Sequence, residues 1–262
     1  MEKNFAEEII ELKKNPELNV WKIKKLYIQN HPGNGFLYKY ASCTDFLIDN
    51  LKNTRLWTSY IYKLNDLFEM SISIKKSKTA APDAKLRDQL HEIMKTTSVC
   101  SLSESNNNLK MWAHYSNCHT GVCLEYDYFK ILRRYTENNL YKVFYSNKEY
   151  ELSVDQTDEQ LLHTCISSIC TKSTIWEEEK EWRIIINENS DNEYGNYLNS
   201  IRPSKVYFGS RIDKECRNQI IDICKGLNIR YQQMVKKENE VIPVNVECST
   251  VNTLGQWIEK NN

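Results

Sequence analysis

Helical and strand periodicities alternate along the chain without a repeating order. Apolar residues at helical spacing predict helices over residues 4–14, 17–29, 44–51, 83–95, 158–171 and 213–225. β-Branched and aromatic runs predict strands over residues 36–40, 56–59, 98–102, 120–126, 140–145, 181–187, 203–208 and 228–234. Because strands and helices mix without a regular βαβ rhythm, we predict an α+β fold with a mostly antiparallel, curved sheet flanked by helices.

The two N-terminal helices are predicted to form an appendage. Pro16 separates them, since proline disfavours helix in the residue before it. The loop His31-Pro-Gly-Asn-Gly35 then ends the second helix. We therefore assign residues 1–33 to a helical appendage and residues 34–262 to a single α+β domain with a family-like core.

Charge and composition narrow the function classes. The 262 residues include 35 basic and 35 acidic side chains, so the formal net charge is +0. This balance gives no electrostatic case for non-specific nucleic-acid or membrane binding, although a local basic patch stays open. No apolar run approaches the roughly 20 residues of a spanning helix, and the N-terminal sequence lacks a signal-peptide core. We expect a cytoplasmic protein whose nine cysteines are reduced.

The strand expected to begin near Glu179 carries the strongest functional signal. Its side chains alternate between an apolar face and a face that presents Glu179, Glu181 and Arg183. Charges that enter a sheet need partners or a ligand. These three residues therefore predict a functional site in which Arg183 pairs with a carboxylate. The alternative is a solvated edge strand with an ion pair across one face.

Two further segments carry candidate binding residues. Asn65, Asp66 and Glu69 follow the strand at 56–59 and lie in a predicted tight turn. Trp112 and Tyr115 lie in a short helix and could stack a planar ring such as nicotinamide. The alternatives are a turn whose carboxylates face water and a helix that belongs to the core.

A local group of histidines and cysteines has the residue types of a zinc site. Its members are His114, Cys118, His119 and Cys123. Their spacing matches no common zinc finger or ribbon, and no second half-site follows. We therefore expect no metal from this group.

A series of short motifs occurs in a recognisable order. The motifs are Leu37-Tyr-Lys-Tyr40, Trp57-x-Ser59, Asn65-Asp-x-Phe-Glu69, Leu102-Ser-Glu104, Met111-Trp-Ala-His-Tyr115, Gly121-Val-x-Leu-Glu125, Lys172-x-x-x-Trp176 and Glu179-x-Glu-x-Trp-Arg183. The series resembles the bacterial family of unknown function DUF2971 over about residues 36–210. Leu67 and Thr120 depart from it, since the family usually has proline and a basic residue there. The family name implies no reaction.

The chain also resembles, more loosely, ADP-ribosyltransferase domains. These place basic or aromatic residues on an early strand, a serine on the next and a glutamate on a later one, which here are Tyr38, Tyr40, Ser59 and Glu181. The resemblance implies that Glu181 holds a ribose hydroxyl and stabilises an oxocarbenium-like centre as nicotinamide leaves. Tyr38, Tyr40, Trp112 and Tyr115 would form the nicotinamide cleft.

Three function classes follow. The leading hypothesis is an NAD-using ADP-ribosyltransferase or NAD glycohydrolase, acting as a toxin or anti-phage effector, with NAD as substrate and no metal. The second is a metal-dependent nuclease or hydrolase, in which Mg²⁺ or Mn²⁺ is held by Asp66, Glu69, Glu179 and Glu181. The third is a ligand-sensing or protein-binding module whose N-terminal helices dock a partner. The substrate, small molecule or macromolecule, and the oligomeric state stay open.

Overall fold

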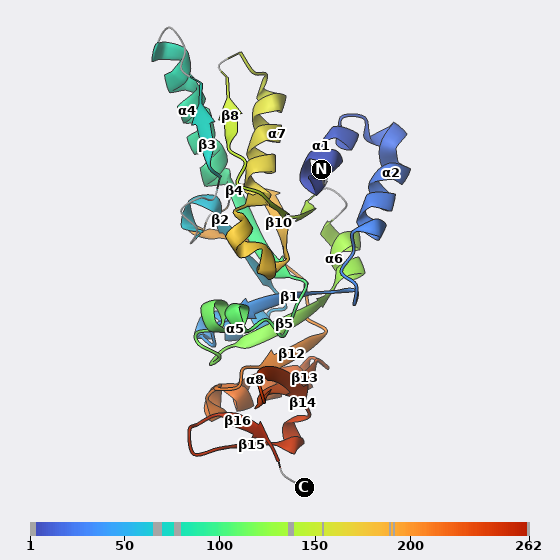
Figure 1. Ribbon diagram of the computed structural model, residues 1–262, viewed down its shortest axis with the longest axis vertical. Helices are drawn as coiled ribbons and strands as arrows, with labels where there is room; N and C mark the ends of the chain where they lie inside the picture. Colours follow the sequence, from blue (N-terminus) through green and yellow to red (C-terminus); the bar gives the residue numbers. More distant parts are fainter. Residues whose placement is uncertain are drawn as a thin grey trace. The chain divides into compact units, whose positions relative to one another are not determined.

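The structure confirms the α+β class. This computed structural model describes residues 4–64, 70–75, 80–135, 139–153, 155–188, 190 and 192–260 (Figure 1). The helices are α1 (Phe5–Lys13), α2 (Pro16–Gln29), α3 (Asp45–Lys52), α4 (Ala80–Thr96), α5 (Leu109–Tyr115), α6 (Tyr128–Tyr135), α7 (Asp158–Ile169) and α8 (Lys214–Gly226), with 3-10 helices η1 (Ile61–Lys63), η2 (Thr174–Glu179) and η3 (Val246–Cys248).

The strands pair mostly antiparallel. They are β1 (Phe36–Ala41), β2 (Leu56–Tyr60), β3 (Ile72–Ile74), β4 (Thr97–Ser103), β5 (Val122–Asp127), β6 (Leu140–Lys142), β7 (Phe144–Tyr145), β8 (Tyr150–Leu152), β9 (Thr171–Lys172), β10 (Glu181–Asn187), β11 (Gly195–Leu198), β12 (Lys205–Phe208), β13 (Arg230–Lys237), β14 (Glu240–Val244), β15 (Ser249–Val251) and β16 (Trp257–Glu259). Parallel pairs are β3 with β8, β7 with β9 and β12 with β13. Among the described helices, none has both the length and the apolar sequence needed to cross a membrane.

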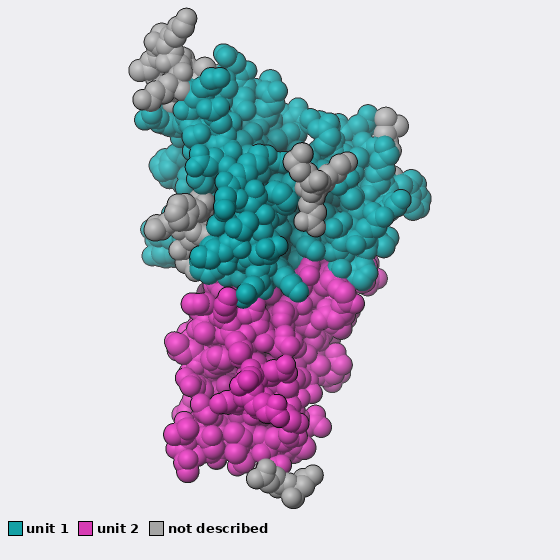
Figure 2. All heavy atoms as spheres, viewed as in Figure 1, with its two compact units in different colours: residues 1–31, 57–101, 135–197 teal, residues 32–56, 102–134, 198–262 magenta. Residues whose placement is uncertain are grey.

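The chain folds as two compact units, each assembled from three separate stretches (Figure 2). Unit 1 contains residues 1–31, 57–101 and 135–197, and unit 2 contains residues 32–56, 102–134 and 198–262. The N-terminal helices group with unit 1. The predicted boundary between residues 33 and 34 stays a prediction.

In unit 1, the sheet holds the N-terminal helices through aromatic contacts. Strand β4 pairs antiparallel with β2, and β10 pairs with β4 and, antiparallel, with β6. The Phe5 ring of α1 meets the rings of Tyr27 and Trp182 edge-on, at centroid distances of 5.3 and 5.5 Å. The Tyr27 hydroxyl donates to the Leu140 carbonyl at 2.7 Å. Burying these rings fixes both helices to the sheet.

In unit 2, five strands follow one another in the order β1, β5, β12, β13 and β14. Helix α5 contributes Trp112 to an apolar cluster on one face of these strands. Helix α8 contacts β13 and also α3. Cys43 and Cys216 form a disulfide, so the prediction that all nine cysteines are reduced is wrong for this pair. Their contact required a fold that brings residues 173 positions apart together.

Candidate functional site

The predicted charged face lies at the start of β10 in unit 1. Glu181 is the first residue of the strand, and Arg183 follows two positions later on the same face. The prediction that the strand begins near Glu179 is wrong, because Glu179 ends the 3-10 helix η2. Lys180 adopts a left-handed backbone, with φ of 46°, and turns the chain between helix and strand.

Four buried side chains form a charge quartet, which comprises Lys172, Glu179, Glu181 and Arg183. Lys172 Nζ donates to Glu179 Oε2 at 2.7 Å and to Glu181 Oε2 at 3.3 Å. Arg183 donates from Nε to Glu181 Oε1 at 2.8 Å and from Nη2 to Glu181 Oε2 at 3.1 Å. This bidentate contact confirms the predicted pairing of Arg183 with a carboxylate. Arg183 Nη1 also donates to the Ile169 carbonyl.

The quartet keeps Glu181 ionised. Burial alone would raise the pKa of Glu181, but the charges of Arg183 and Lys172, with hydrogen bonds from Arg183 and Ser101, outweigh it and lower the pKa to about 2. The carboxylate therefore neither gives nor takes a proton in the neutral range. Two cations balance two anions, so the buried group has no net charge. Burial and the nearby Glu181 raise the pKa of Tyr145, whose hydroxyl accepts from the Glu181 backbone N–H at 2.7 Å.

Each carboxylate of the quartet pairs with a cationic side chain. Within the described ranges, no group of three or more His, Cys, Asp or Glu side chains is placed to hold a metal ion. Asp66 and Glu69, the other proposed metal ligands, lie outside the described residues, as does Asn65. The metal cluster therefore stays a prediction.

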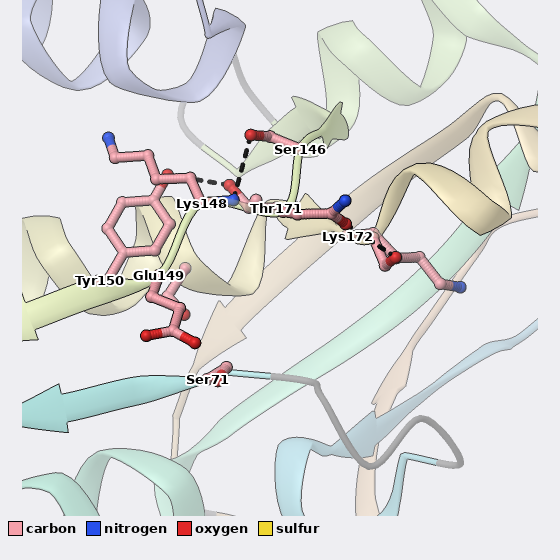
Figure 3. Close-up of a pocket in the computed structure, with 10 residues that line it drawn as sticks. Ser71, Ser146, Lys148, Glu149, Tyr150, Thr171 and Lys172 are labelled. Carbon is pink, nitrogen blue, oxygen red and sulfur yellow. Dashed lines mark hydrogen bonds between the residues drawn. The ribbon is translucent and has the colours of Figure 1, made fainter.

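A pocket of about 240 Å³ shares Lys172 with the quartet (Figure 3). It is lined by Ser71, Ser146, Asn147, Lys148, Glu149, Tyr150, Ser168, Thr171, Lys172 and Ser173. Six of these ten side chains carry a hydroxyl group. The parallel pairing of β7 with β9, with Phe144 opposite Thr171, brings the two main wall segments together.

Hydrogen bonds fix the pocket walls. The hydroxyls of Thr171 and Tyr150 share a hydrogen bond of 2.9 Å. Ser173 Oγ donates to Asn147 Oδ1 at 3.0 Å. Figure 3 shows Ser71 across the pocket from Thr171. Such fixed hydroxyls form a preorganised polar surface.

The predicted ring-binding residues lie together in unit 2. Tyr38, Tyr40 and Trp112 are buried in one apolar cluster, and the half-buried Tyr115 packs against it. Trp112 has no exposed surface, and its ring meets Tyr40 edge-on with centroids 5.2 Å apart. Its indole Nε1 donates to the Asn106 carbonyl at 2.8 Å. These contacts give the residues a place in the core, and their role in binding a planar ring stays a prediction.

Ser59 falls in the other group of predicted residues. It lies on β2 in unit 1, where its hydroxyl accepts from Trp57 Nε1 at 3.0 Å. Unit 1 thus contains Ser59 with the charged residues of β10, whereas unit 2 contains the aromatic residues. The arrangement implied by the ADP-ribosyltransferase resemblance, with Glu181 acting next to the nicotinamide cleft, stays a prediction.

Two buried charged residues, Lys172 and Glu125, were not predicted as site residues. Lys172 connects the quartet to the pocket. Glu125 is buried on β5, and its Oε2 accepts from the Tyr207 hydroxyl at 2.7 Å. Both belong to the motif series. A single charge within the apolar strand Val122-Cys-Leu-Glu-Tyr126 was the signal available for Glu125.

The motif series has a counterpart among known families. The sequence model of the family described as "Protein of unknown function (DUF2971)" matches residues 111–184. This confirms the suspected DUF2971 resemblance. The DUF2971 match covers α5 from Met111 onward, Glu125, the pocket walls from 146 to 173 and Arg183, whereas Tyr38 and Ser71 lie outside it. Searches among curated proteins and among solved structures gave no match.

Proposed function

We propose that unit 1 binds a ribose-bearing nucleotide in the hydroxyl-lined pocket, with NAD as the first ligand to test. The observation that carries this proposal is the concentration of six hydroxyl-bearing side chains around one small cavity. A hydroxyl group both donates and accepts hydrogen bonds, so such a wall complements the adjacent hydroxyls of a ribose ring. The hydroxyls of Tyr150, Thr171 and Ser173 already have protein partners, and a hydroxyl oxygen with two lone pairs can accept a further hydrogen bond from a ligand.

The volume of the pocket accommodates only the ribose of such a nucleotide. Its volume of about 240 Å³ is below the roughly 300–1,000 Å³ of pockets for drug-sized molecules. A pentose fits within it, and the remainder of a nucleotide extends outside. Lys148 lies at the wall and pairs with Glu7 at 2.8 Å. Because an exposed ion pair contributes little free energy, Lys148 can leave Glu7 and contact a phosphate group with little loss of stability.

For the reaction we propose NAD-using glycohydrolysis or ADP-ribosyl transfer. The bond between the nicotinamide nitrogen and ribose C1′ breaks, its electron pair stays on nicotinamide, and water or an acceptor group bonds to C1′ and releases its proton to solvent. Glu181 is ionised, with a pKa of about 2, but Arg183 and Lys172 balance its charge and it does not line the pocket, so we do not assign it the stabilisation of the positive charge on the ribose. Because Glu181 is fully engaged by Arg183 and Lys172, we assign it electrostatic positioning of Lys172 and no proton transfer.

The other two classes receive different weight. A nuclease metal would have to displace Lys172 and Arg183 from the quartet carboxylates, which disfavours that class. A non-enzymatic ligand sensor needs only the pocket, and it is our second candidate. Exposed Trp21 and Ile28 on α2 are the residues that we would assign to a docked protein partner. A toxin or anti-phage effector in the cytoplasm is the role that NAD consumption would imply.

The test combines binding with catalysis. Calorimetric titration with ADP-ribose and with NAD should show binding to the wild-type protein, and chromatography of an NAD incubation should show free nicotinamide. Ser146→Leu fills the pocket from its wall and should weaken binding at least tenfold. Ser153→Leu is the matched control, since Ser153 is also half-buried in unit 1 but lies outside the pocket.

The outcomes separate the candidates. Binding without nicotinamide release favours the sensor. Cleavage of nucleic acid with Mg²⁺, lost in Glu179→Gln, favours the nuclease. Absence of ADP-ribose and NAD binding, or equal binding by Ser146→Leu and wild type, would refute the pocket proposal.

A further inference from the structure

Helix α2 presents an exposed apolar stripe with a lysine on either side. Trp21 and Ile28 are seven positions apart, so they share one face of the helix, and they are 78% and 58% exposed. Lys24 and Lys25, which are also exposed, follow Trp21 by three and four positions and flank the stripe. Residues 18–44 include no aspartate or glutamate. We call Trp21, Lys24, Lys25 and Ile28 the basic patch of unit 1.

The 3-10 helix η2 presents a surface of the opposite charge. Ile175 is 77% exposed, and in a helix with three residues per turn it shares a face with Glu178. Glu177 and Glu178 are both exposed. Residues 173–179 include no lysine or arginine. We call Ile175, Glu177 and Glu178 the acidic patch of unit 1.

Both patches lie on elements that the fold holds in place. The opposite face of α2 is buried through Ile23 and Tyr27, and the Tyr27 hydroxyl donates to the Leu140 carbonyl at 2.7 Å. Helix η2 ends at Glu179, whose buried carboxylate accepts from Lys172 at 2.7 Å. Surfaces that are fixed before binding lose little conformational entropy when a partner contacts them. Both patches are therefore suited to docking.

We propose that the docked partner is a second copy of this chain, with the basic patch of one copy against the acidic patch of the other. Trp21 and Ile175 meet at the centre, and lysines and glutamates pair around them. The observation that selects this partner is that one chain carries both complementary patches. Its formal net charge of +0 also removes the long-range repulsion that keeps highly charged proteins apart. The pocket lining includes none of these residues, so the proposal does not depend on nucleotide binding.

The test is sedimentation velocity of the whole protein between about 1 and 100 μM, because two short patches give a small contact of moderate affinity. A reciprocal pair of contacts closes a two-fold dimer, whereas a one-way contact adds copies in a row. In either case the mass should rise with concentration above the 31.0 kDa of one chain. About 0.5 M salt should weaken the association at least tenfold, since it screens exposed ion pairs.

Exchange of the charges identifies the two surfaces. Lys24→Glu combined with Lys25→Glu should weaken the association at least tenfold, because like charges then face each other. Glu177→Lys combined with Glu178→Lys should do the same. The variant with all four substitutions again has opposite charges on the two patches, and its affinity should return to within about threefold of wild type.

The matched control is Lys85→Glu combined with Lys95→Glu, which makes the same charge change at exposed positions of α4 and should leave the affinity within about threefold of wild type. Two results would overturn the proposal. One is a wild-type protein that keeps the mass of one chain at every concentration. The other is a four-substitution variant that associates as weakly as either double variant.

Sedimentation with lipid vesicles separates the second copy from a different occupant of α2. A wild-type protein that stays monomeric but sediments with vesicles of phosphatidylcholine and phosphatidylglycerol, and loses this in the variant Lys24→Glu with Lys25→Glu, would assign the basic patch to an anionic lipid surface. That result would also overturn the proposal.

Discussion

Replacement of Glu181 by glutamine tests whether the charge quartet holds unit 1 together. Glutamine has the same shape, but its amide nitrogen would face Lys172 or Arg183, which donate to the carboxylate at 2.8 to 3.3 Å. Glu179 alone would then balance two buried cations. Removing one partner of a buried ion pair typically costs about 3–5 kcal/mol. We expect Glu181→Gln to lower the free energy of unfolding by an amount in this range.

The pKa of Glu181 gives a second estimate of the free energy that its ionised form contributes to folding. Its value falls from the usual 4.5 to about 2 on folding. At about 1.4 kcal/mol per pKa unit, the difference corresponds to roughly 3.5 kcal/mol of stability. Because the folded pKa is the lower one, this stability is present above about pH 4.5. It is lost as the pH falls toward about 2. The Glu181→Gln variant should lack this part of the acid dependence.

The assay is urea unfolding followed by tryptophan fluorescence, at neutral pH and at several values between about pH 5 and pH 2. Glu177→Gln is the control, since Glu177 is exposed, and its free energy of unfolding should stay within about 0.5 kcal/mol of wild type. The reasoning fails if Glu181→Gln matches Glu177→Gln at neutral pH and keeps the wild-type dependence on acid.

Four further variants give predictions. Arg183→Lys should lower the free energy of unfolding by about 2 kcal/mol in urea titrations, because lysine cannot reproduce the bidentate contact; an unchanged midpoint would contradict this. Gly121→Ala should destabilise the protein by several kcal/mol, because its Cβ would lie 2.1 Å from a backbone oxygen. Gly226→Ala, where a Cβ meets nothing within 4 Å, should be neutral or slightly stabilising in a thermal melt. Replacing both Cys43 and Cys216 by serine should lower the melting temperature measured by calorimetry, since the disulfide closes a long loop; an equal melting temperature would argue against it.

Local signals predicted much of the secondary structure. A helix was predicted to begin at residue 44, and Thr44 caps it: its side chain accepts from the Leu47 backbone N–H at 3.3 Å. The pairing of Arg183 with a carboxylate was predicted from the two-residue alternation of a strand, and the structure gives Glu181 as the partner. Both contacts join residues that are at most three positions apart, so their geometry follows from local backbone conformation.

The position of Lys172, the pocket and the division into two units depend on tertiary contacts. Lys172 contacts Glu179 and Glu181 across a turn in which Lys180 takes a left-handed conformation, which no residue type there signalled. The pocket combines Ser71 with segments 146–150 and 168–173, and the second and third of these meet through a parallel strand pair. The two compact units each draw on three distant stretches. Periodicity within a short window contains no information about such assembly.

The most direct test of the central proposal is a crystal structure of the protein soaked with ADP-ribose. The account predicts electron density for a ribose ring in the unit 1 pocket, with its hydroxyls within hydrogen-bond distance of the Thr171 or Ser173 side chains. An empty pocket at saturating ADP-ribose, or a nucleotide bound elsewhere on the protein, would contradict it.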